Sequence, residues 1–191
     1  TEVKGHTSSG RLFPSGFYSP DGLMPLDPEL IQEDISSSFF RDDDVARHPY
    51  DGRTVPDTSD ESEEKYSWAK APRYNGRPAE TGPLADMLIS GKELFVKEVQ
   101  ASGANVLLRE LARLIRPAIL LPAIDQWLDE MSTCNSPFYK GHTKLVTAKG
   151  FGLVPAPRGG LGHWVTIENG VIANYQVITP PSLNASPKYA R

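Results

Sequence analysis

Residues 152–180 read GLVPAPRGGLGHWVTIENGVIANYQVITP, and this stretch gives the clearest structural signal in the chain. Predominantly apolar segments occupy Phe151–Val154, Gly162–Ile167 and Val171–Ile178. The turn Glu168-Asn169-Gly170 separates the last two, and Asn-Gly favours tight hairpins because both residues tolerate a positive φ. The stretch therefore predicts short strands, with a hairpin between the last two.

The segment before these strands is predicted to be helical over Pro83–Ala101 and Asn105–Met131. In the second helix, leucine and isoleucine recur at three- and four-residue spacing, which is the pattern of a helix face packed into a core. Pro117 and Pro122 lie inside this helix. Because proline lacks an amide donor and its ring crowds the preceding turn, these residues are expected to kink or break the helix.

The first part of the chain is predicted to hold one or two short strands and a short helix. Residues 11–27 contain proline and glycine too often for a helix, and Ser19-Pro20-Asp21-Gly22 has the composition of a turn. Asp27-Pro28 resembles an N-cap followed by proline at the first helical position, which predicts a helix to about Phe39. Asp42–Asp44 are expected to end this helix.

Residues 41–74 sustain neither helical nor strand periodicity, which predicts a long irregular segment that packs against neighbouring parts of the protein.

The fold class that follows from these elements is α+β, mainly helical with small β ribbons at both ends. The chain starts at Thr1 without an initiator methionine or the apolar core of a signal peptide, so its start is expected to be cut from a longer protein.

Composition excludes several kinds of site and partner. The formal charge is −4 and no concentrated basic stripe occurs, so nucleic acid is not an expected partner. No apolar run approaches the roughly 20 residues that span a bilayer, so no transmembrane segment is expected. Cys134 is the only cysteine and is expected to be a half-buried apolar residue. With no second cysteine and no ligand spacing among the histidines, no metal site is predicted within this chain.

Five blocks of the sequence resemble, in the same order, the large subunit of NiFe hydrogenases. Together they cover most of the chain. The resemblance of residues 152–180 is to the uptake-type enzymes, which oxidise hydrogen. The blocks are His48–Gly52 with Thr54 and Pro56, Lys65–Gly76, Pro78–Ala85, Ala156–Trp164, and Tyr175–Gln176 running to Asn184–Pro187.

The resemblance implies heterolytic oxidation of H2 at a Ni-Fe(CN)2(CO) centre, with electrons passed to an iron-sulfur small subunit. In this family two Cys-x-x-Cys pairs, one near each end of the complete subunit, hold the metals. Neither pair occurs here. Residues 1–191 are therefore expected to be an internal portion of a single large-subunit domain, inactive alone and lacking both cysteine-pair regions. The expected location is cytoplasmic or peripherally membrane-associated.

Two alternatives stay open at this point. A subunit of the quinone module of respiratory complex I has the same fold without the metals, and its relatives also keep a Pro-Arg-Gly turn. Those relatives generally lack the blocks at Pro78–Ala85 and Tyr175–Pro187. The other alternative is a non-catalytic isolated fragment.

Arg158 is the catalytic residue that the resemblance implies. In the family, the arginine of the Ala-Pro-Arg-Gly block lies over the open metal position and reaches toward an iron-bound cyanide. A planar guanidinium can hold a diatomic ligand and stabilise developing charge, but it releases a proton reluctantly. The choice between base and electrostatic helper stays open. Pro157 would aim Arg158 by fixing the preceding backbone, while Gly159 and Gly160 permit close approach of a cofactor.

The resemblance places a second wall of the site at residues 179–184, Thr-Pro-Pro-Ser-Leu-Asn. The family usually has a proline, two hydroxyl residues, tryptophan and asparagine here. Pro180 matches, but Pro181 replaces the first hydroxyl residue, which normally donates to the other cyanide. Either Ser182 or water takes over that contact, or the ligand is held differently. Leu183 in place of tryptophan is a further departure.

His163 and Glu80 are assigned supporting roles. Imidazole suits nickel, but the family's histidine at the position of His163 is not a metal ligand, so a structural or hydrogen-bonding role is expected. Glu80 has the chemistry of a proton relay. Because the family's best-known relay glutamate lies upstream of this chain, Glu80 is expected to be a structural anion.

Overall fold

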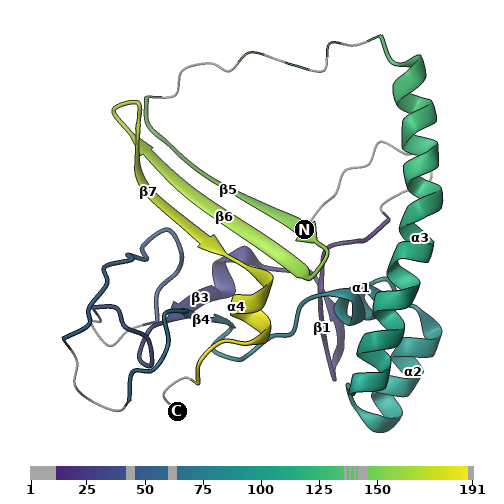
Figure 1. Ribbon diagram of the computed structural model, residues 1–191, viewed down its shortest axis with the longest axis horizontal. Helices are drawn as coiled ribbons and strands as arrows, with labels where there is room; N and C mark the ends of the chain where they lie inside the picture. The colour runs from purple at the N-terminus through teal and green to yellow at the C-terminus, as the bar shows by residue number, and fades with distance from the viewer. Residues whose placement is uncertain are drawn as a thin grey trace. The chain divides into compact units, whose positions relative to one another are not determined.

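The computed structural model of the protein describes residues 12–41, 46–59, 64–135 and 146–188, together with residues 137, 139 and 141. The chain forms two compact units, Thr1–Pro25 with Pro83–Lys144 and Leu26–Gly82 with Leu145–Arg191. The first unit is mainly helical, and the second is built from small sheets and one short helix (Figure 1). The predicted α+β class is confirmed.

In its described residues, the helical unit contains a hairpin and three helices. Strands β1 (Phe17–Ser19) and β2 (Gly22–Met24) are antiparallel and enclose the predicted turn. The helices are α1 (Pro83–Ile89), α2 (Glu93–Ser102) and α3 (Val106–Thr133). The core of the unit combines side chains from all three helices with one aromatic ring that precedes β1: Phe13, Leu84, Met87, Leu88, Phe95, Leu108 and Ala112.

One prediction about these helices was wrong. Pro83–Ala101 is not a single helix, because Gly91 takes a left-handed backbone conformation, with φ of 64°, between α1 and α2. Helix α3 continues through Pro117 and Pro122, so these prolines do not break it, and the kink that was the other expected effect stays a prediction. Each proline removes one amide donor, but a helix of 28 residues keeps enough regular hydrogen bonds on either side to stay continuous.

The second unit begins with a further correction. The helix expected from Asp27 to Phe39 is only the 3-10 turn η1 (Pro28–Leu30), which Asp27 caps by accepting the Glu29 amide at 3.0 Å. Strand β3 (Ile31–Asp34) follows and pairs antiparallel with β4 (Ala71–Tyr74). The backbone partner that β4 supplies outweighs the local helix signal. The expected end at Asp42–Asp44 lies outside the described residues.

The predicted strands near the C-terminus form one antiparallel sheet in the order β5-β6-β7. Asn169 and Gly170 form the turn between β6 and β7 with φ of 52° and 78°, which confirms the hairpin. Helix α4 follows β7 directly (Figure 1). The elements are β5 (Ala148–Ala156), β6 (Gly159–Glu168), β7 (Val171–Ile178) and α4 (Pro180–Asn184).

An almost buried ion pair joins β3 to the segment before β4. Glu33 and Lys70 side chains are only 6% and 10% exposed, with Lys70 Nζ 3.4 Å from Glu33 Oε2. Lys70 also donates to Gln176 Oε1 on β7 at 2.8 Å. Burial raises the pKa of Glu33, and the lysine opposes that shift without cancelling it. The segment predicted to be irregular, residues 41–74, thus ends in an ordered strand and contributes a buried charge.

None of the helices in the described part of the chain is both long and apolar enough to cross a membrane.

Candidate functional site

Arg158 lies at the tip of the hairpin between β5 and β6. Ala156 and Gly159 are the last paired residues, so Pro157 and Arg158 form the two-residue turn. Both side chains are exposed. The Arg158 guanidinium has no hydrogen-bond or ion-pair partner among the described residues. Its donors are therefore available to a group that approaches the hairpin tip.

The loop at Thr81-Gly82 packs closely against this turn. Gly159 has φ of +136°, and a methyl group added there would lie 2.5 Å from Thr81 Cγ2. A methyl group added at Gly82 would lie 3.0 Å from the carbonyl oxygen of Arg158. These glycines are thus required by contact within the chain. The approach of a cofactor to Gly159 stays a prediction.

The segment after β7 forms the second predicted wall. Pro180 is buried at the first position of α4, whereas Pro181 is exposed. The first-turn amides of a helix need no partner within the helix, so Pro181 fits here without loss of a hydrogen bond. Thr179 caps the helix by accepting the Ser182 amide at 3.4 Å. The hydroxyl groups of Thr179 and Ser182 also lie 2.9 Å apart.

The hairpin tip and the segment after β7 both contact Thr81. Its amide donates to Asn184 Oδ1 at 2.9 Å, and its carbonyl accepts from Asn184 Nδ2 at 2.9 Å. Its hydroxyl accepts the Gly160 amide at 2.7 Å. The hairpin tip, the Thr81 loop and the end of α4 therefore form one cluster. Sequence reasoning did not single out Thr81, because its partners lie 79 and 103 residues away in the chain.

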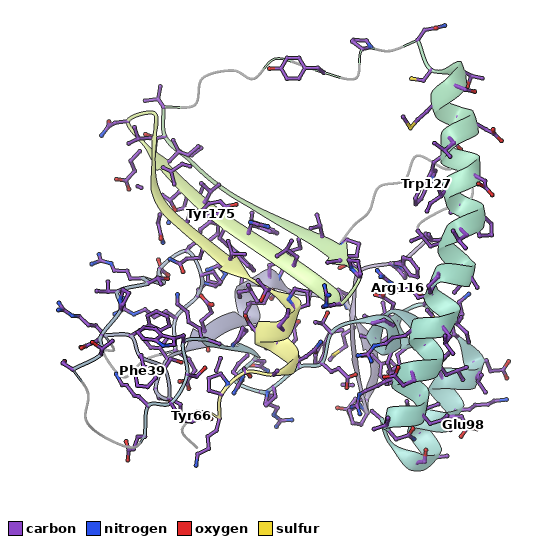
Figure 2. The ribbon with its side chains drawn as sticks, in the orientation of Figure 1. Phe39, Tyr66, Glu98, Arg116, Trp127 and Tyr175 are labelled. Atoms are coloured by element: carbon purple, nitrogen blue, oxygen red, sulfur yellow. The ribbon has the colours of Figure 1, made fainter. Side chains whose placement is uncertain are left out.

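His163 and Glu80, the two residues with predicted supporting roles, lie in different surroundings. His163 is on β6, and its Nδ1 is 2.7 Å from the hydroxyl group of Tyr175 on β7. Tyr175 is labelled on the sheet in Figure 2. Glu80 immediately precedes Thr81 and its side chain is exposed. The structure thus places Glu80 beside the cluster and His163 in a cross-strand hydrogen bond.

The model of the nickel-dependent hydrogenase family matches residues 2–191. The chain belongs to this family. It is similar to the uptake hydrogenase large subunit of Azotobacter chroococcum mcd 1, with 33% identity over 98% of this chain and 40% of the relative. The corresponding values for the uptake hydrogenase large subunit of Afipia carboxidovorans are 34%, 85% and 34%. The chain therefore spans less than half the length of these relatives.

The fold agrees with the family. The reduced Ni-Fe-Se hydrogenase of D. vulgaris Hildenborough matches 96% of this chain and 41% of its own chain, with a TM-score of 0.81 and 28% identity. The resemblance inferred from the five sequence blocks is thus confirmed, and the chain corresponds to part of a hydrogenase large subunit.

The family implies a nickel-containing centre. No cluster of three or more His, Cys, Asp or Glu side chains occurs in the described ranges. Cys134 follows α3 and is exposed rather than half-buried, which corrects the expectation from sequence. The cluster around Arg158 offers hydrogen-bond donors instead. A place for this cluster beside such a centre stays a prediction.

Proposed function

We propose that the complete protein is the catalytic large subunit of a NiFe uptake hydrogenase, and that this chain forms part of its active-site wall. The metal centre, when bound, supplies the heterolytic cleavage of H2, and electrons pass to an iron-sulfur small subunit. Its cysteine ligands lie outside residues 1–191, since Cys134 is the only cysteine here. The observation that carries the proposal is an exposed Arg158, without a partner among the described residues, at a hairpin tip of a hydrogenase-family chain.

In this proposal Arg158 acts as an electrostatic helper. Its guanidinium presents several N–H donors in a fixed plane, which suits a small anionic ligand. Pro157 restricts the backbone before it. The contacts of Thr81 with Gly160 and Asn184 hold the surrounding cluster. Such a fixed positive charge stabilises charge that develops during the reaction without needing to reorganise.

The proposed function is tested with the complete protein that contains this sequence. We expect H2-dependent reduction of a viologen dye and about one nickel per protein by elemental analysis. The isolated 191-residue chain is the matched control and is expected to show neither. A complete protein that contains no nickel and does not oxidise H2 would favour the metal-free, complex-I-like alternative. About one nickel per isolated chain would contradict the placement of the ligands.

The departure at Pro181 gives a spectroscopic prediction. We propose that an iron-bound cyanide near α4 lacks its usual hydroxyl donor, or receives it from Ser182. In the first case Pro181→Ser shifts one of the two cyanide infrared bands, and in the second Ser182→Ala does so. A charge-assisted hydrogen bond is worth about 1.5–3 kcal/mol, which is enough to perturb the bond it contacts.

The second cyanide band serves as an internal control in both variants and is expected to stay in place. Spectra of both variants that superimpose on wild type would show that neither residue contacts the centre, and the placement of this wall would then be wrong.

A further inference from the structure

The amide of Gly160 needs an acceptor that the sheet does not supply. β7 pairs with β6 only from Gly162 onward, so Gly160 lies beyond the end of β7. The hydroxyl group of Thr81 accepts this amide at 2.7 Å and so acts in place of the missing strand. Gly160 is partly buried, where an amide without an acceptor is costly.

Thr81 also fixes the turn by its shape. The methyl group of Thr81 faces Gly159 so closely that only a glycine fits there. Its backbone is held by both polar groups of the Asn184 side chain. One residue therefore limits the movement of the hairpin tip in three ways: through its hydroxyl group, its methyl group and its backbone.

We propose that Thr81 is a positioning residue that holds the Arg158 turn in register with α4. This inference rests on the proposed function, because it assigns Thr81 an effect on turnover that operates through Arg158. Thr81 itself touches no reacting group. Its hydroxyl group orients the backbone two residues after Arg158, and the angle of that backbone sets the direction of the guanidinium.

The test uses the complete, metal-replete enzyme with substitutions of Thr81, made alone and in combination with Arg158→Lys. Thr81→Val keeps the shape but removes the acceptor, so kcat is expected to fall about tenfold with KM nearly unchanged. Thr81→Ser restores the acceptor and is expected to retain at least half of kcat. In an Arg158→Lys background, Thr81→Val is expected to change kcat less than twofold, because the side chain it positions is already altered.

Amide hydrogen exchange gives a readout independent of activity. The Gly160 amide is expected to exchange at least tenfold faster in Thr81→Val than in wild type, and at the wild-type rate in Thr81→Ser. Thr166→Val is the matched control, since Thr166 is a nearly buried threonine on β6 whose side chain makes no hydrogen bond with the described residues. It is expected to change neither the Gly160 exchange rate nor kcat.

The outcomes distinguish a positioning role of Thr81 from general damage to the fold. Wild-type kcat in Thr81→Val overturns the positioning role, and so does an equal loss in the Arg158→Lys background, which would mark general damage to the fold. If Thr81→Val yields no metal-replete enzyme, Thr81→Ser decides: a wild-type kcat and Gly160 exchange rate support the role of the hydroxyl group, and a tenfold loss overturns it. Faster Gly160 exchange in a complete protein that never oxidises H2 would refute the proposed function but not the contact.

Discussion

Replacement of Arg158 by lysine is expected to lower the kcat of the complete enzyme by about a hundredfold to a thousandfold, the usual effect of losing one preorganised donor at a site of developing charge. Lysine keeps the positive charge but loses the planar arrangement of donors. Arg158 is exposed and unpaired among the described residues, so its removal breaks no structural contact described here. Folding and metal insertion are therefore expected to survive.

The measurement combines H2 uptake kinetics with nickel content and infrared spectra of the cyanide and carbonyl bands. Arg53→Lys is the matched control, because Arg53 is another exposed arginine of the same unit, outside the cluster around Arg158. It is expected to leave kcat within twofold of wild type. Wild-type turnover in a metal-replete Arg158→Lys enzyme would remove Arg158 from the mechanism.

The second large effect is expected on stability, from Lys70→Met. This change leaves the carboxylate of Glu33 buried without its counter-charge and deprives Gln176 Oε1 of a donor. Breaking a buried ion pair from one side typically costs about 3–5 kcal/mol. The midpoint of thermal unfolding, measured by calorimetry on the complete protein, is expected to fall clearly at neutral pH.

The loss in Lys70→Met is expected to depend on pH. Burial already raises the folded-state pKa of Glu33, so the stability linked to this group is full below its unfolded-state pKa and is lost as pH rises through the folded-state pKa. Without Lys70 the opposing attraction disappears and the pKa rises further. The difference in unfolding midpoint from wild type should therefore be large at neutral pH and shrink under acidic conditions.

Lys97→Met is the control for this stability prediction. Lys97 pairs with Glu93 one turn away on α2, but both side chains are more than two-thirds exposed. Removal of such a surface pair is expected to change stability by less than about 0.5 kcal/mol. Equal effects of the two substitutions, or a Lys70→Met effect that does not shrink at acidic pH, would show that Glu33 is not destabilised by loss of a charge partner.

Sequence patterns predicted the C-terminal sheet well and the N-terminal part poorly, for a physical reason. The strands within Phe151–Ile178 are joined by short turns, so their pairing is encoded by neighbouring residues such as Asn169-Gly170. Strand β3 instead pairs with β4, about forty positions further along the chain. The N-cap of Asp27 is real, but the hydrogen bonds from β4 end the helix after a single turn.

The residues of the candidate site also differ in whether the sequence could identify them. Arg158 and the wall residues Pro180, Pro181 and Ser182 could be named from family blocks, and their catalytic or cofactor roles stay predictions. Thr81, the acceptor of the Gly160 amide, could not be identified from the sequence. Threonine hydroxyls bind many partners, and no local pattern marks one that binds an amide 79 residues away.

The sequence by itself determined the family, the α+β class, the hairpin that turns at Asn169-Gly170, and the lack of a cysteine pair, because these depend on residue identity and on neighbours a few positions apart. Only the tertiary structure decided that Thr81 joins the Arg158 turn to α4, and that Glu33 and Lys70 share a buried position. These contacts join distant segments, so they arise only when folding excludes water from the polar groups and brings their partners within hydrogen-bond distance.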